Sequence, residues 1–163
     1  MTQTRIFSLL FLGLLSISAS PVIARSLSSS ATIISFWRMF LACGFLWIYS
    51  SFFISKNLKL SYNSRINTFF SGILLGVHFI FFYEAVKITT IANATFLGTL
   101  APFFTLILEF LLLKRSYRKS VYIGLLVAFL GTLLFLIHDF DLSSRYTIGN
   151  IYAVLCSICL SIS

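Results

Sequence analysis

Long apolar segments, each about as long as a bilayer is thick, follow one another along this chain with only short polar connections between them. A helix needs roughly 20 apolar residues to cross the hydrocarbon core of a membrane. Backbone polar groups in lipid must be paired within their own segment, so each segment is predicted to be a helix. The predicted spans are residues 6–24, 31–55, 66–86, 91–113 and 120–138, followed by a truncated sixth over residues 148–163. The expected fold class is an all-α membrane protein, a polytopic transmembrane helix bundle.

The composition excludes a water-soluble protein. Only 10% of the 163 residues are charged, against about 25% in ordinary soluble domains. Such a chain cannot cover a globule with a polar surface, which argues against a cytosolic enzyme, a secreted disulfide domain and a disordered chain. The net charge of +8 does not indicate a nucleic-acid partner, because the basic residues are dispersed among the connections instead of sharing one solvated face. The expected surroundings are a lipid bilayer.

The basic residues predict the orientation of the helices. Cytoplasmic connections of membrane proteins carry an excess of lysine and arginine. Connections that belong to one side hold Arg5, then Lys56, Lys59 and Arg65, then Lys114, Arg115, Arg118 and Lys119. The opposite side holds only Arg25, Lys87 and Arg145. We therefore expect a cytoplasmic N-terminus in a cell inner or plasma membrane.

The first apolar segment also has features of a cleavable secretory signal. Arg5 precedes it, and small and apolar residues close it at positions 22–24. The apolar stretch is longer than the usual signal core, and the next span follows within a few residues. Retention as a first span is the preferred interpretation, with cleavage as the alternative.

Two ionisable residues lie inside predicted spans, where charge is costly and usually meets a partner or water. Arg38 lines a polar cavity that attracts an anionic group, or extends to the outer interface, or braces a neighbouring helix. His78, in the middle of the third span, suits a proton-coupled carrier because its ordinary pKa is near neutrality. A hydrogen bond to a neighbouring helix explains His78 as well and is the preferred interpretation.

Three further charged residues lie near the ends of spans. Glu84 and Lys87 are three positions apart near an outer end, so an ion pair is the first interpretation and ligand contact the second. Glu109 precedes the basic cluster of residues 114–119 and is expected to extend toward it at the inner face. A role of Glu109 in proton or cation coupling is the alternative.

Prolines and glycines predict helix geometry. Pro102 cannot donate a hydrogen bond to the Gly98 carbonyl, so the fourth span is expected to kink there, and Pro21 is expected to do the same in the first. Kinks of this kind recur in transporters, although they also arise from packing alone. Small residues allow close helix contact. The glycines expected to serve helix packing are Gly72, Gly76, Gly98, Gly124 and Gly131.

No catalytic motif occurs in the sequence, and we expect neither an enzyme nor a cofactor. The spacing of Cys156 and Cys159 matches a C-x-x-C motif, which elsewhere marks redox or zinc chemistry. With no second pair and no nearby histidine in the sequence, a structural role is preferred and no metal site is predicted.

Several segments together resemble the drug/metabolite transporter superfamily, specifically its EamA-type domain. Residues 20–25, Ser-Pro-Val-Ile-Ala-Arg, look like the end of the family's first helix, and residues 36–42, Phe-Trp-Arg-Met-Phe-Leu-Ala, resemble its arginine-bearing second helix. Residues 81–104 resemble its aromatic-Ala-Leu-Lys, small-residue, Leu-x-Pro-x-Phe signature across the third and fourth helices. Gly124 and Gly131 stand where the family places glycines in its fifth helix. The resemblance covers about residues 6–138, one five-helix repeat.

The chain departs from the family pattern in two ways. Lys114-Arg115-Ser116 stands where the family usually has Gly-Glu-Arg, which removes the loop glutamate. Family members typically carry ten helices in two inverted repeats, with the substrate path between the halves, whereas this sequence reaches only into a sixth helix.

The resemblance implies a transporter that moves a small metabolite or drug-like solute by alternating access, without ATP hydrolysis, as an N-terminal half or truncated carrier. It would work as a homodimer or beside a separately encoded second half. The alternative is a non-transporting membrane scaffold or remnant of a transporter. The substrate cavity is expected to be lined by Arg38, His78, Tyr83, Asn93 and Pro102, with Glu84 and Lys87 near its outer mouth.

Overall fold

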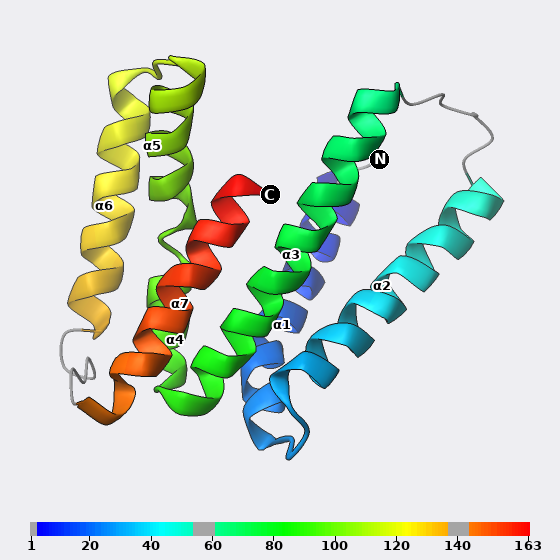
Figure 1. Cartoon of the computed structure of the whole chain (residues 1–163). Coiled ribbons are helices and arrows are strands. Elements are labelled where there is room, and N and C mark those ends of the chain that lie inside the picture. Colours follow the sequence, from blue (N-terminus) through cyan, green and yellow to red (C-terminus); the bar gives the residue numbers. More distant parts are fainter. Residues whose placement is uncertain (1–2, 54–60, 137–143) are drawn as a thin grey trace.

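The structure, a computed structural model, describes residues 3–53, 61–136 and 144–163, and these residues form helices joined by short connections, with no strand among them. Figure 1 shows the arrangement. The helices are α1 (Gln3–Ser26), α2 (Ala31–Phe53), α3 (Tyr62–Ile88), α4 (Ile91–Gly98), α5 (Ala101–Leu113), α6 (Lys119–Leu136) and α7 (Ser144–Ile162). The predicted all-α helix bundle is confirmed.

Among the described residues, four helical segments are long and apolar enough to cross a membrane: α1, α2, α3, and α4 together with α5. Over their described residues, α6 and α7 are shorter apolar helices. The predicted ends at residues 55 and 138 lie outside the described residues. Helix α7 begins at Ser144, before the predicted start at residue 148.

The fourth predicted span is broken into two helices. Thr99 and Leu100 turn between α4 and α5, with the Leu100 amide donating to the Leu97 carbonyl at 3.3 Å. Pro102 stands in the first turn of α5, where the missing N–H costs least. The interruption predicted at Pro102 is therefore present as a full break. Pro21, by contrast, lies inside α1, which stays helical to Ser26.

Helix α7 packs along α3, and the two lie side by side near the centre of the bundle (Figure 1). Ala85 and Val86 of α3, Ala94 of α4 and Ala153 of α7 form one buried cluster, and each is 0% exposed. Ala24, Ala31 and Tyr83 form a second cluster between α1, α2 and α3. Large apolar side chains elsewhere on α1, α2 and α6 are exposed, as expected for surfaces that face lipid.

The glycines differ from their predicted roles. A methyl group at Gly72, Gly76, Gly124 or Gly131 would meet no atom within 4 Å. None of these four therefore serves a close helix contact within the described part of this chain, where they lie on open helix faces. Gly98 does contact a neighbour, since a Cβ there would lie 3.8 Å from the Phe82 ring.

Helix α7 approaches the end of α3 closely at Gly149, which is not among the glycines predicted for helix packing. A Cβ on Gly149 of α7 would lie 2.8 Å from both the backbone nitrogen and the Cβ of Thr89. It would also lie 3.2 Å from the Cβ of Ile88. Only a residue without a side chain lets α7 cross the end of α3 at this distance.

Candidate functional site

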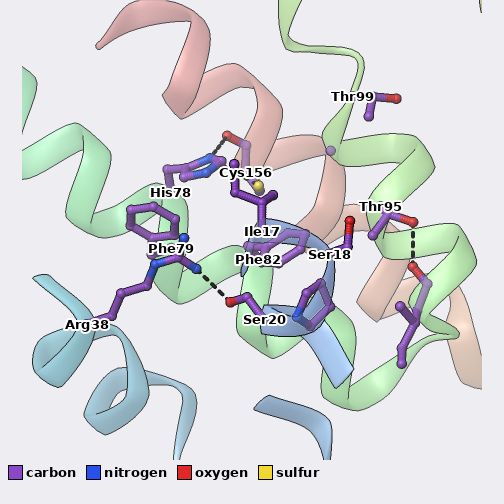
Figure 2. A pocket seen from close by; sticks show the side chains of 13 residues that line it. Ile17, Ser18, Ser20, Arg38, His78, Phe79, Phe82, Thr95, Thr99 and Cys156 are labelled. Carbon is purple, nitrogen blue, oxygen red and sulfur yellow. Dashed lines mark hydrogen bonds between the residues drawn. The ribbon is translucent and has the colours of Figure 1, made fainter. Parts of the chain in front are cut away.

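A cavity of about 440 Å³ opens between α1, α2, α3, α4 and α7 (Figure 2). Its size lies within the range of about 300–1,000 Å³ typical of small-molecule sites. Aromatic and aliphatic side chains make up much of its wall, and hydroxyl, imidazole, guanidinium and thiol groups interrupt them. The lining residues are Ile17, Ser18, Ser20, Pro21, Arg38, His78, Phe79, Phe82, Ile91, Thr95, Gly98, Thr99 and Cys156.

Arg38 enters the cavity from α2 and contacts two other helices. Its Nη1 atom donates a hydrogen bond to Ser20 Oγ on α1 at 2.8 Å and another to the Tyr83 hydroxyl on α3. The guanidinium carbon lies 4.4 Å from the centre of the Phe79 ring, a cation–π arrangement. Arg38 thus both lines the cavity and braces its neighbours, so two of the alternative interpretations hold together. Its guanidinium lies against α1 and α3.

His78 lies close to Arg38, with Phe79 between them in Figure 2. Its Nδ1 atom is 2.9 Å from the Cys156 carbonyl oxygen and 3.1 Å from the Cys156 sulfur. A carbonyl only accepts, so Nδ1 carries the proton in this contact, and in a neutral ring Nε2 is then an acceptor. The preferred expectation, a hydrogen bond to a neighbouring helix, is confirmed, and the neighbour is α7.

The other three residues predicted for the cavity occupy different places. Tyr83 is 1% exposed, contacts Arg38, and lines an adjoining hollow of about 370 Å³. Asn93 is buried beside the end of α3, where its side-chain amide donates to Thr89 Oγ1 at 3.4 Å. Pro102 lines a separate hollow of about 160 Å³ between α4, α5 and α6. Neither Asn93 nor Pro102 therefore lines the cavity at Arg38, since Asn93 is held at Thr89 and Pro102, after the break, faces α6.

Several lining residues were missed in the sequence. Thr95 and Thr99 are four positions apart and share one side of the cavity, a spacing that predicts one helix face. Ser18 and Ser20 come from α1, and Cys156 comes from α7. The spacing of Thr95 and Thr99 was visible in the sequence, whereas the position of Cys156 depends on how α7 packs.

The predicted ion pair between Glu84 and Lys87 is absent from the described part of the chain. Lys87 Nζ donates instead to two backbone carbonyls in the connection between α1 and α2, to that of Leu27 at 3.3 Å and to that of Ser29. Glu84 is only partly buried and has no ion-pair partner among the described residues. This expectation was wrong because free carbonyls at the end of α1 compete for the ammonium group.

We expect Lys87→Met and Glu84→Gln to differ in their effect on stability. Loss of the ammonium leaves the Leu27 and Ser29 carbonyls without this donor, which should lower the free energy of unfolding by about 1 kcal/mol. Glu84→Gln should change stability by less than about 0.5 kcal/mol. Thermal unfolding of the purified proteins in detergent measures both, and equal losses would instead indicate that the two side chains pair.

A second polar group of residues joins α1, α3 and α7 at the end of the bundle where α3 ends and α4 begins. Arg25 Nη1 donates to the Thr89 carbonyl at 3.0 Å, and Thr89 Oγ1 donates to Asn150 Oδ1 at 2.9 Å. Thr89 is 0% exposed. The Thr90 side chain accepts from the Asn93 backbone amide at 3.0 Å and caps α4. These contacts hold the end of α3 between its neighbours, next to the close approach at Gly149.

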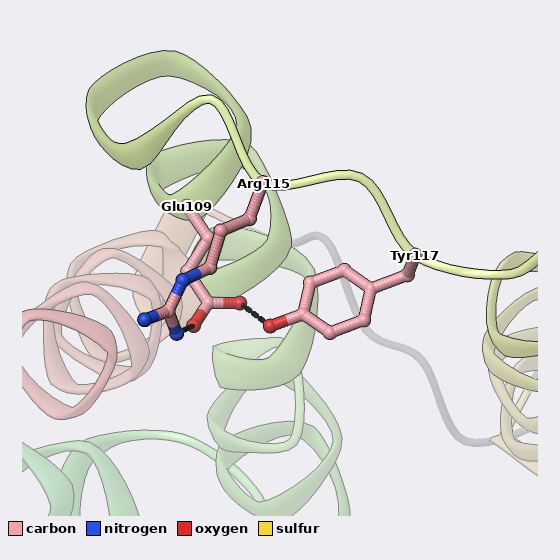
Figure 3. Close-up of polar contacts among 3 residues, drawn as sticks. All are labelled: Glu109, Arg115 and Tyr117. Carbon is pink, nitrogen blue, oxygen red and sulfur yellow. Dashed lines mark hydrogen bonds and ion pairs between the residues drawn. The ribbon is translucent and has the colours of Figure 1, made fainter.

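Glu109 lies near the end of α5, at the opposite end of the bundle in Figure 1, and Figure 3 shows its contacts. Its carboxylate is 3.7 Å from Arg115 Nη1 and accepts a hydrogen bond from the Tyr117 hydroxyl. That hydrogen bond raises the pKa of Tyr117 above its ordinary value, because a carboxylate acceptor favours the protonated phenol. Lys114 ends α5 in the left-handed region at φ 50°. The predicted contact of Glu109 with the basic cluster is therefore confirmed.

The described residues contain no group of three or more histidine, cysteine, aspartate or glutamate side chains that could hold a metal ion.

A comparison with protein-family models matches residues 4–137 to the EamA-like transporter family. The match covers most of the chain and stops before α7. No curated protein and no solved structure matches the chain significantly.

Proposed function

We propose that this chain, which belongs to the EamA-like transporter family, moves a small solute across a membrane through the cavity at Arg38. The observation that carries this proposal is the cavity itself. A charged guanidinium, an imidazole and several hydroxyls face a space of about 440 Å³ inside an otherwise apolar bundle. Polar and charged groups inside a membrane-spanning bundle are costly, and they typically belong to a solute path.

The break between α4 and α5 supports the same proposal. Gly98 and Thr99 stand at the break and also line the cavity. Interrupted helices expose backbone groups to substrates in many transporters. Because this span is already divided into α4 and α5, the wall of the cavity can change direction at the break without the unfolding of a long helix.

For the working state, we propose that this repeat pairs with a second copy or with a separately encoded second half. The protein would lie in the inner or plasma membrane of the cell, with its N-terminus in the cytoplasm. The charge distribution supports that orientation, because the ends of successive helices alternate between the two ends of the bundle in Figure 1 and the basic residues favour one set of connections in the sequence.

A side chain that fills the cavity should stop transport. In α4, Thr95 lines the cavity and bonds to the Ile91 carbonyl at 2.7 Å. Thr68 in α3 is a matched control, because it is exposed and bonds to the Ser64 carbonyl at 2.8 Å. Overfilling a packed site costs about 1–3 kcal/mol, so Thr95→Trp should slow transport about tenfold or more, whereas Thr68→Trp should not.

Liposomes loaded with a cell metabolite extract provide the measurement. Mass spectrometry identifies solutes that leave liposomes containing the protein faster than protein-free liposomes. At least one solute should leave through the wild-type protein and the Thr68→Trp variant and be retained by Thr95→Trp. If no solute leaves through any of the three proteins, transport by copies of this chain alone is wrong, and a carrier that needs a separately encoded second half or a non-transporting scaffold remains.

A further inference from the structure

We propose that the cavity selects an organic anion, with its carboxylate or similar group bound to Arg38 and its apolar body against Phe79 and Phe82. This inference rests on the proposed function and names the class of solute. It depends on the charges, the free hydrogen-bond donors and the wall of the cavity.

The charge in the cavity is not balanced by the described part of the protein. Arg38 lines the cavity, and its two hydrogen-bond partners, Ser20 and Tyr83, are neutral. The described carboxylates are Glu84 and Glu109, and neither lines the cavity. Glu109 is already paired with Arg115 at the far end of the bundle. An arginine in a low-dielectric site favours a negative partner, and an anionic solute would provide one.

Arg38 also retains donors for a ligand. Both of its hydrogen bonds come from the Nη1 atom, and a guanidinium has five N–H donors. Within residues 3–53, 61–136 and 144–163, no acceptor pairs with Nη2 or Nε. The fork of a guanidinium matches a carboxylate, which accepts two parallel hydrogen bonds. The contacts to Ser20, Tyr83 and Phe79 hold the group in place, so little side-chain entropy is lost when the anion binds.

The other residues that line the cavity indicate the shape and polarity of the rest of the solute. Figure 2 shows Arg38, Phe79 and His78 along one side of the cavity and Thr95 and Thr99 on the other. Ile17 and Phe82 lie between them and present apolar surface, and Ile91 also lines the cavity. This arrangement fits a molecule with one anionic end and an apolar or aromatic body, and a strongly cationic molecule would meet Arg38 without a counter-charge.

Three probes of nearly equal shape test the charge preference: 3-phenylpropionate, 3-phenylpropanamide and 3-phenylpropylamine. Binding is measured by equilibrium dialysis against the protein in phosphatidylcholine nanodiscs at neutral pH. A charge-assisted hydrogen bond is about twice as strong as a neutral one, so we expect the anion to bind at least about tenfold more tightly than the amide. The amine should bind more weakly than the amide.

Arg38→Gln should remove the preference for the anion, and Arg65→Gln provides the matched control. Arg65 carries the same charge on an exposed part of α3, so its loss should leave the ratio of the three affinities unchanged. A second arm replaces part of the lipid with phosphatidylglycerol. If that lipid displaces 3-phenylpropionate, the anion at Arg38 is a lipid headgroup and the solute assignment is overturned.

The remaining outcomes separate this inference from the proposed function. Equal binding of the three probes, or tighter binding of the amine, overturns the anion preference while the cavity remains a solute site. An anion preference that persists in Arg38→Gln also overturns it. Failure of the proposed function appears in a different experiment, as liposomes from which no solute leaves.

Discussion

Replacing Gly149 by valine is expected to separate α7 from α3. A Cβ at this position would lie 2.8 Å from the backbone nitrogen of Thr89, and backbone cannot move aside as a flexible side chain can. Overpacking of this kind costs about 1–3 kcal/mol and occasionally more. The Cys156 thiol, which is 0% exposed, reports the separation, because its reaction with a maleimide requires α7 to open from the bundle. The labelling rate should rise about fivefold to a hundredfold.

Gly131→Val is the matched control for this substitution. A Cβ at Gly131 meets nothing within 4 Å, and valine has a better helix propensity than glycine. The measurement uses a background in which Cys43 and Cys159 are serine, so that Cys156 alone reacts. Equal labelling rates in the wild-type protein and the Gly149→Val variant would show that the close approach at Thr89 is not needed for the fold.

Ending the chain at Leu136 is expected to destabilise the remaining helices, although the family match covers residues 4–137. Without α7, Ala85 and Val86 lose the neighbour Ala153, and His78 loses the Cys156 carbonyl. Exposure of this buried site and loss of the interhelical hydrogen bonds should together lower the free energy of unfolding by about 2 kcal/mol or more. The melting temperature in detergent should fall by about 5 °C or more, and the amides of residues 83–89 should exchange faster with deuterium.

Restoring the missing helix is the control for that truncation. A separate peptide of residues 144–163, expressed together with the shortened chain, should bind it and return the melting temperature toward that of the whole chain. A shortened chain that keeps the original melting temperature and exchange rates would show that the five-helix repeat is stable by itself, and α7 would then be an accessory.

Local chemistry made part of the site predictable. The missing N–H of proline predicted a break at Pro102, which is present, although Pro21 with the same chemistry leaves α1 helical to Ser26. Glu109 contacts Arg115, six residues away in the chain, so sequence proximity was sufficient there. Lys87 was predicted wrongly from the same kind of reasoning, because its partners at Leu27 and Ser29 are brought near by the turn between α1 and α2. The nearest opposite charge in sequence was not its nearest acceptor in space.

The amino-acid sequence by itself determined where helices form, how long they are and where one of them breaks, because lipid offers no water to an unpaired backbone and each segment must satisfy its own hydrogen bonds. Tertiary structure alone decided which faces meet, including the contact of Gly149 with Thr89 and of Cys156 with His78. The reason is that lipid tails solvate one apolar face as well as another, so hydrophobicity does not choose between partners. Close packing and interhelical hydrogen bonds make that choice, and they depend on residues that are far apart in the chain.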